Sequence, residues 1–382
     1  MDYFCSIWYK LVMKINLSKK DLQTLIKLLH TREINIDVSS MYLYYLTNET
    51  YSIKEKNILS LMNKRKLSVN QAFYYEFINV LDLDYKDEDY ILANKTCKIS
   101  DIKALDIEKY ISNPYYQTIK VPEVKEETWY FKYDRIEAYE GFMYNDISVL
   151  ENEYFAEKSS FGFFQKPYKY LSVSEGDDIW MCVTPHEMET MEPSINEARG
   201  NVLVFGLGLG YYPFMISRKS NVNSITIIEK DVRVISLFKK YILPQFPNKE
   251  KITIIEEDAF SYLKKNDIEN KFNYSFVDLW HNVDDGIPLY LRFKKETKEM
   301  IRTHFSYWIE TSLLVYLRRL MLSLLDEQAD NANEDNYLKE ENYDDHIINR
   351  MYQITKNMTI NSIEEIYTLL SDNGLRKIAE EI

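Results

Sequence analysis

The chain has 382 residues, of which 46% are apolar and 28% charged, and its formal net charge is −13 at pH 7. This length and composition predict a globular protein of two or three domains. The acidic balance argues against nucleic acid as a partner, because binding to a phosphate backbone requires clustered Lys and Arg. The longest apolar run, 313–325, contains Arg318 and Arg319, so we expect no membrane span.

The cysteines and histidines argue against disulfide bonds and against a metal site. Cys5, Cys97 and Cys182 are odd in number and widely spaced, which predicts free thiols in a reducing compartment. His304 and His346 have no partners at metal-ligand spacing, so no metal is expected. The first fourteen residues contain neither an uninterrupted apolar core nor a cleavage-site pattern, so no signal peptide is expected. Together these features predict a cytoplasmic protein.

Residues 1–118 are predicted to form a helical N-terminal domain, because apolar residues recur at helical spacing after suitable N-caps. Predicted helix starts lie at Ser18, at Ser52 with Glu55, and at Ser68 with Gln71. We find no cluster of chemically active side chains in this region. Its position suggests a role in recognition or dimerisation, and a homo-oligomer is one expected assembly.

The pattern changes at residues 119–184, where short aromatic or β-branched runs are separated by Gly, Pro and Asp. Runs of this kind predict a small antiparallel β-region built of hairpins. Gly141, Gly162 and Gly176 fall between the runs and are interpreted as turn residues.

Residues 185–310 alternate between strand and helix patterns, which predicts an α/β, Rossmann-like domain with a parallel sheet. The expected strands are 202–205, 225–229, 252–255, 274–278 and 304–309. The expected helices are 211–219, 232–243, 259–265 and 287–301. In such sheets the ligand binds beyond the carboxyl ends of the strands.

Residues 311–382 are predicted to form a helical C-terminal extension. Within it, 326–345 is acidic and rich in Asn, which is typical of a solvated, flexible linker. Ser362 with Glu365 predicts the start of a further amphipathic helix.

The strongest motif is the segment 201–211, NVLVFGLGLGY, which holds three of the nine glycines of the chain. A buried strand runs into Gly206, Gly208 and Gly210, and a helical pattern follows. Glycine lets the backbone approach a ligand closely at a helix N-terminus. A P-loop would need Lys and Ser or Thr after the turn, and G-x-G-x-x-G would need glycine at Tyr211. The remaining pattern, G-x-G-x-G, is the spacing of the class I S-adenosylmethionine-dependent methyltransferase fold.

Carboxylates at three later strand ends strengthen this interpretation. Glu229 follows the second strand, where it can accept hydrogen bonds from both ribose hydroxyls. At the third strand end, Asp258 and the backbone of Ala259 are candidates to bind adenine, although Asp258 also suits a helix N-cap. Asp278 and His281 follow the fourth strand, where the sulfonium and the acceptor would meet. His281 is the best candidate base, and Asp278 is expected to orient it or to contact the cofactor.

The segment 185–278 and the β-region before it resemble spermidine synthase and its methyltransferase-fold relatives. The resemblance lies in His186-Glu187-Met188, VLVFGLGLG, IIEKDVRVI with Glu229, the EEDAF loop and the strand ending at Asp278. It implies an N-terminal β-domain over the active site and a role for His186 in contacting cofactor or acceptor. Three departures stand out: Leu209 replaces an aspartate that holds the aminopropyl amine, His281 replaces the second aspartate of Asp-x-x-Asp, and Pro185 replaces a tyrosine.

These observations predict a transferase that uses S-adenosylmethionine to methylate a small-molecule or peptide acceptor. The lost carboxylates are the reason for ranking methyl transfer above the first alternative, an aminopropyltransferase that uses decarboxylated S-adenosylmethionine and an amine. A second alternative is a non-catalytic module that keeps the nucleoside pocket and serves assembly.

Overall fold

The computed structural model describes residues 14–126, 128–176, 178–265, 267–329 and 343–382. Cys5 and the proposed absence of a signal peptide concern residues 1–14, nearly all of which lie outside the described part. Within the described residues, Cys97 and Cys182 are free cysteines. No helix in those ranges is both long and apolar enough to cross a membrane.

The predicted parallel sheet is present. Its strands are β11 (Gly200–Phe205), β12 (Val222–Glu229), β13 (Ile252–Glu256), β14 (Tyr274–Val277) and β15 (His304–Tyr307). They are hydrogen-bonded in the order β13-β12-β11-β14-β15, and all four neighbouring pairs are parallel. The central strand β11 is buried from Val202 to Phe205, which explains its continuous apolar sequence.

The four expected helices correspond to α8 (Tyr211–Ser217), α9 (Val232–Leu237), α10 (Ala259–Lys265) and α12 (Val283–Thr297), the last of which begins and ends four residues earlier than expected. Two further helices were not expected: α7 (Pro185–Glu197), which precedes β11, and the short α11 (Ile268–Lys271). A short π-helix (Phe238–Ile242) and 3-10 turns at Leu243–Gln245 and Lys249–Lys251 follow α9.

The order of the strands determines where a ligand can bind. The chain moves outward from β11 through β12 to β13, then returns to the other side of β11 for β14 and β15. The loops after β11 and β14 therefore leave in opposite directions and open a crevice at the carboxyl edge of the sheet. The glycine turn begins at that edge.

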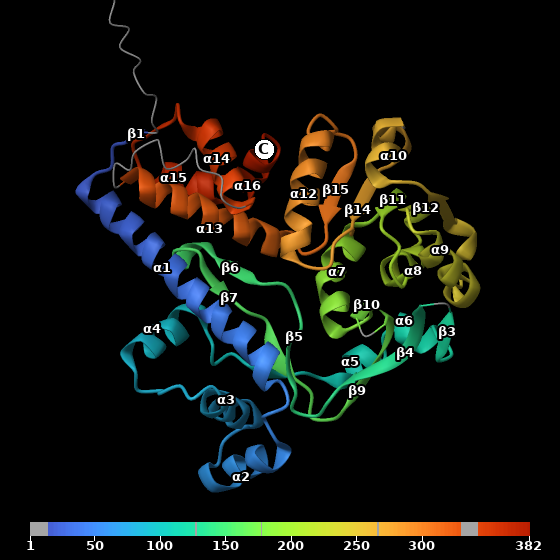
Figure 1. Ribbon diagram of the computed structural model, residues 1–382, viewed down its shortest axis with the longest axis horizontal. Helices are drawn as coiled ribbons and strands as arrows, with labels where there is room; N and C mark the ends of the chain where they lie inside the picture. The colour runs from blue at the N-terminus through green and yellow to red at the C-terminus, as the bar shows by residue number, and fades with distance from the viewer. Residues whose placement is uncertain (1–13, 127, 177, 266, 330–342) are drawn as a thin grey trace, which may run out of the picture.

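The region before this domain contains several small sheets (Figure 1). One is antiparallel, in the order β10-β9-β4-β3, with β3 (Val124–Glu126), β4 (Trp129–Ile136), β9 (Tyr168–Glu175) and β10 (Asp178–Cys182). A second sheet has the order β2-β8-β5, with β2 (Lys103–Ala104), β8 (Phe161–Phe163) and β5 (Gly141–Met143). A third consists of β6 (Ser148–Leu150) and β7 (Ala156–Lys158). The hairpin prediction is incomplete, because β4 pairs with the distant β9 and β2 pairs with β8 in parallel.

The N-terminal region is helical over most of its length. Its helices are α1 (Lys19–Tyr44), a π-turn (Tyr45–Glu49), α2 (Glu55–Arg65), α3 (Val69–Val80), α4 (Glu88–Cys97), α5 (Ile107–Ile111) and α6 (Pro114–Thr118). The predicted caps at Ser18 and Ser68 are confirmed, the latter as a full capping box with Gln71. The cap at Ser52 is wrong: Lys54 occupies the N-cap of α2, and the Ser52 hydroxyl donates to Glu49 instead.

The C-terminal part is also helical. It contains α13 (Glu310–Ala329), α14 (Tyr343–Thr355), α15 (Ile363–Leu370) and α16 (Asp372–Ala379), and a short strand β16 (Thr359–Ile360) pairs with β1 (Lys14–Ile15). The N-cap at Ser362 is confirmed. The flexible-linker prediction for 326–345 is wrong at both ends, since 326–329 continue α13 and 343–345 begin α14. Residues 330–342 lie outside the described part.

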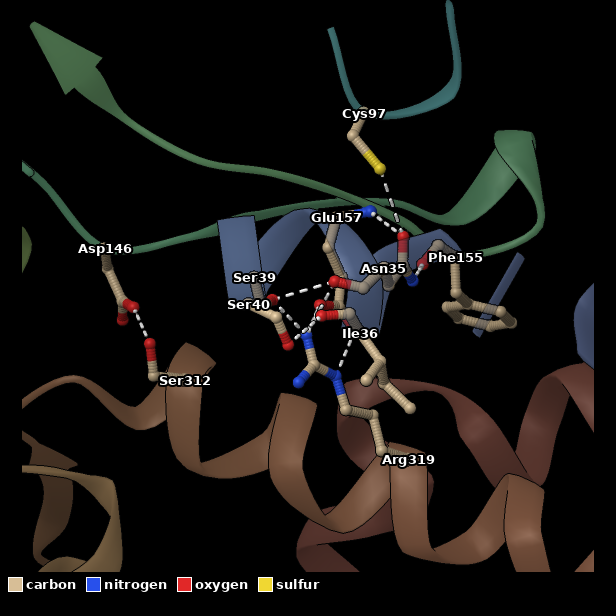
Figure 2. Close-up of polar contacts among 10 residues, drawn as sticks. All are labelled: Asn35, Ile36, Ser39, Ser40, Cys97, Asp146, Phe155, Glu157, Ser312 and Arg319. Carbon is tan, nitrogen blue, oxygen red and sulfur yellow. Dashed lines mark hydrogen bonds and ion pairs between the residues drawn. The ribbon is translucent and has the colours of Figure 1, made fainter. Parts of the chain in front are cut away.

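Helices from the two ends of the chain pack together: α1 lies against α13 and α15 (Figure 1). A buried polar network, which we call the α1–β7–α13 junction, fixes this contact through Asn35, Ser39, Glu157 and Arg319 (Figure 2). The Arg319 guanidinium forms an ion pair with Glu157, which is 3% exposed, and donates to the Ser39 hydroxyl at 2.7 Å. The Asn35 amide spans the same junction, donating to the Phe155 carbonyl at 3.0 Å and accepting from the Glu157 backbone N–H at 3.0 Å.

Candidate active site

The glycine turn forms the floor of a cavity of about 530 Å³ at the carboxyl edge of the sheet. Gly206 has φ +96°, and a Cβ there would lie 1.9 Å from the carbonyl oxygen of Asp278, so glycine is required for the turn to pass the β14 loop. Gly208 has φ +51°, and a Cβ there would meet only the Met181 sulfur at 4.0 Å. The turn at Gly208 thus faces open cavity, as a close approach to a ligand requires.

Glu229 lines the cavity at the end of β12. One carboxylate oxygen accepts the Leu207 N–H at 3.2 Å, and the other accepts the Asp231 N–H at 2.8 Å. These bonds hold the carboxylate beside the glycine turn, and its remaining lone pairs are available to hydroxyl donors.

Asp258 and Ala259 also line the cavity, at the start of α10. The Asp258 carboxylate accepts the Ser261 N–H at 2.9 Å, which is the hydrogen bond that a helix N-cap makes.

Two further carboxylates, Asp278 and Glu187, lie deep in the cavity, and we call them the deep carboxylate pair. Burial and the nearby charge of Glu229 raise the pKa of Asp278 to about 7. Burial and the charge of Asp278 raise the pKa of Glu187 well above its ordinary range. Among the described residues, neither carboxylate has a hydrogen-bonding or ion-pairing side chain. The pair therefore requires either a shared proton or a cationic ligand.

His281 lies at the rim of the cavity, where its ring meets that of Trp180 edge-on at 5.0 Å. Its partner is Asp285 rather than Asp278: the His281 Nδ1 lies 3.0 Å from the Asp285 carboxylate. The same carboxylate accepts the backbone N–H groups of His281 and Asn282 and completes the capping box of α12. With a proton on Nδ1 for this contact, Nε2 carries the free lone pair.

His186 is not among the residues that line the cavity. Its ring is packed edge-on against Trp308, and burial lowers its pKa to about 4, so the imidazole is neutral at pH 7. Trp308 does line the cavity and donates from Nε1 to the Thr190 hydroxyl at 2.9 Å. His186 therefore supports the cavity wall from behind.

The structure brings together most of the predicted site. Gly206, Gly208, Gly210, Glu229, Asp258, Ala259, Asp278 and His281 all line one cavity. Leu209, at the position where the resemblance implies an amine-binding aspartate, is buried and lines the cavity with an apolar side chain.

Sequence reasoning did not identify Glu187 and Asp285 as site residues, although the motif containing Glu187 was noted. Each stands three residues after a helix N-cap, so each resembles an ordinary capping residue. For Asp285 that role is real. For Glu187 the Thr184 hydroxyl accepts its backbone N–H at 3.4 Å, while its carboxylate lies in the cavity.

Comparisons with known proteins give the following matches. Residues 186–302 match the family model for the spermine/spermidine synthase domain. A polyamine aminopropyltransferase from Clostridium botulinum is 27% identical over 177 residues, which are 45% of this chain and 58% of that protein. A crystal structure of spermidine synthase from Thermotoga maritima aligns with 40% of this chain and 59% of its own, at 16% identity and a TM-score of 0.29. The chain thus spans less than two thirds of either relative.

These matches overturn the ranking of methyl transfer above aminopropyl transfer. The family model is that of spermine and spermidine synthases, and the curated relative is a polyamine aminopropyltransferase. The methyltransferase prediction gave too much weight to Leu209 and His281, because it did not count Glu187 among the carboxylates of the cavity. Residues 186–302 are therefore similar to the domain of the spermine/spermidine synthases.

Proposed function

We propose that the protein is an aminopropyltransferase that moves the aminopropyl group of decarboxylated S-adenosylmethionine to an amine. The observation that carries the proposal is the series of three carboxylates, Glu229, Asp278 and Glu187, in one cavity beside the glycine turn. This donor has two hydroxyls on its ribose, a positive sulfonium and a terminal ammonium. A nucleoside site that continues into an unpartnered anionic pair suits those groups.

The nucleoside half of the donor is assigned to Glu229 and the loop of Asp258 and Ala259. Glu229 is fixed by two backbone N–H groups and accepts from the ribose hydroxyls. The loop at the start of α10 borders the adenine. Because these contacts are equally strong in substrate and transition state, their contribution is to binding and alignment.

The chemical step is a displacement at carbon. The lone pair of the acceptor nitrogen forms a bond to the aminopropyl carbon attached to sulfur, and the carbon–sulfur bond breaks with its electrons going to sulfur. Sulfur leaves as the neutral thioether of 5′-methylthioadenosine. The acceptor nitrogen loses one proton, for which the available bases are Asp278 and the Nε2 of His281, whose Nδ1 contacts Asp285.

Formation of 5′-methylthioadenosine tests the proposal directly. The purified protein is incubated with decarboxylated S-adenosylmethionine and single amines, from monoamines to polyamines, and the nucleoside products are separated by chromatography. We expect amine-dependent release of 5′-methylthioadenosine. Donor binding without release in the presence of any amine would contradict the proposal and favour the non-catalytic nucleoside-binding module.

A further inference from the structure

Strand β10 gives the cavity an apolar and aromatic rim that the chemical step does not use, and the inference drawn from this rim rests on the proposed function. Ile179 and Trp180 line the cavity, and the Trp180 ring meets the His281 ring edge-on, with 5.0 Å between the ring centres. We call these three residues the β10 rim. Ile179 is 50% exposed and Trp180 38%. Large apolar side chains that are exposed beside a cavity are typical of a surface that a ligand covers.

A β-bulge places Trp180 at the cavity. The residues on either side of Trp180 lie opposite Ser174 and Val173, which are consecutive in β9, so Trp180 is the extra residue of the bulge. Successive side chains of a regular strand point to opposite faces, and a bulge changes this alternation. The bulge explains how the consecutive residues 179–182 can all line one cavity.

The ring of Trp180 is supported from its other side as well. It lies 6.0 Å from the ring of Trp129, which is 1% exposed, and the Arg233 guanidinium lies 4.9 Å from the centre of the Trp129 ring. Contacts with both Trp129 and His281 therefore fix the orientation of Trp180 before any ligand arrives. A surface that is already ordered costs little conformational entropy when it binds.

The carboxylates on the two sides of the β10 rim already have partners. Asp285 accepts two backbone N–H groups at the start of α12 and contacts His281 Nδ1. On the Trp129 side, Arg233 forms ion pairs with Asp231 and Glu175. An ammonium at the rim would lose water and find these carboxylates occupied, whereas a hydrocarbon chain would gain by covering the exposed apolar side chains.

The acceptor amine has to pass this rim. Both proposed bases, Asp278 and His281, belong to the loop between β14 and α12, and this is the loop that contacts Trp180. When the acceptor nitrogen reaches either base, the group that it carries lies beside the rim. We infer that Trp180 is a specificity-determining residue that, with Ile179, binds the hydrocarbon part of the acceptor and favours a primary amine with an alkyl substituent over one with a second ammonium at the rim.

Two matched series of amines test the inference through the kcat/KM for release of 5′-methylthioadenosine. One series runs from butylamine to hexylamine, and the other from 1,3-diaminopropane to 1,5-diaminopentane, in which an ammonium replaces each terminal methyl. We expect the alkylamine to be the better acceptor of each pair, and kcat/KM to rise about two- to fourfold per methylene. In Trp180→Ala, kcat/KM for hexylamine should fall about 5- to 30-fold and the rise per methylene should flatten.

Tyr130→Ala is the matched control. Tyr130 lies on β4 of the same sheet and is 37% exposed, but it does not line the cavity. We expect it to keep the chain-length dependence of the unmodified protein. Trp180→Phe keeps an aromatic ring and should retain most of that dependence. If Trp180→Ala fails to fold, Ile179→Ala removes the other apolar side chain of the rim and should lose about two- to fivefold for hexylamine.

The outcomes separate the inference from the proposed function. No release of 5′-methylthioadenosine with any amine would overturn the proposed function and the inference with it. Release that is faster with each diamine than with its matched alkylamine would leave the function standing, overturn the inference and favour binding of a cation by the Trp180 ring. An unchanged chain-length dependence in both Trp180→Ala and Ile179→Ala would also overturn it. So would an equal loss of affinity for 5′-methylthioadenosine, because Trp180 would then bind the nucleoside.

Discussion

The α1–β7–α13 junction and the cavity both bury carboxylates, and they treat them in opposite ways. At the α1–β7–α13 junction, Glu157 is covered by protein and paired with Arg319, and the guanidinium also reaches Ser39 (Figure 2). In the cavity, Glu187 and Asp278 have no such partner among the described residues. A buried charge is costly unless it is paired. The junction meets this requirement within the chain, whereas the cavity leaves it to a ligand.

The largest expected effect is on stability at the junction. Arg319→Leu leaves Glu157 buried without its cation and should lower the free energy of unfolding by about 3–5 kcal/mol, measured by urea denaturation. The double variant Arg319→Leu/Glu157→Leu should recover most of this loss, because no unpaired charge remains. Arg135→Leu, which breaks an exposed pair with Glu137, is the control and should change stability by less than about 1 kcal/mol. Equal losses in the single and double variants would contradict the contrast.

Glu229 lies between the two extremes, because backbone N–H groups occupy part of its carboxylate. Glu229→Ala should weaken binding of 5′-methylthioadenosine by about 2–3 kcal/mol, as expected for charged hydrogen bonds to ribose. Glu256→Ala, at the end of the neighbouring strand β13 but outside the cavity lining, is the control. An unchanged dissociation constant in Glu229→Ala would place the nucleoside elsewhere.

Removing the charge of Asp278 should stabilise the ligand-free protein, whereas removing the charge of Arg319 should destabilise it. Because its pKa is raised to about 7 in the folded state, the folded protein binds this proton more tightly than the unfolded chain between about pH 4 and pH 7. Its contribution to the stability of the ligand-free protein therefore falls as pH rises through that window. At pH 8, the free energy of unfolding of Asp278→Asn should be about 1–3 kcal/mol higher than that of the unmodified protein, with little difference near pH 4. A destabilised Asp278→Asn protein at pH 8 would mean that Asp278 has a protein partner.

The smallest effect is a pH dependence of donor binding. A cationic donor stabilises ionised Asp278, so binding below pH 7 must release a proton, and affinity should rise up to about tenfold per pH unit as pH increases toward 7. Neutral 5′-methylthioadenosine should show a much flatter profile. Titrations in buffers of different ionisation enthalpy measure the released proton. Identical profiles for the two ligands would show that the deep carboxylate pair does not receive the cation.

The sequence predicted the central sheet well, and it predicted which residues at the strand ends line one cavity, because both depend on local patterns. Each apolar strand of the sheet is followed by a turn, and the glycines and Glu229 stand at strand ends in the order that the sheet topology requires. Glu187 escaped attention because a glutamate three residues after Thr184 has the local pattern of a helix cap. The partner of His281 was assigned by proximity to the strand end, whereas the start of α12 supplies Asp285. The junction was beyond prediction, since nothing local links Ser39 to Arg319, which is 280 residues away.

The packing of α1 has a consequence for synthesis on the ribosome. The C-terminal half of α1 buries Ile34, Val38 and Tyr42 in a cluster with α3 and α4, which are translated soon afterwards. The N-terminal half instead buries Leu25 and Leu28 in the main core, and Arg32 bonds to Ser323, 291 residues later. At about 5–20 residues per second, that partner follows about 15–60 s after Arg32. One part of a single helix can therefore pack against neighbours that are translated soon after it, whereas Arg32 gains its Ser323 partner only 291 residues later.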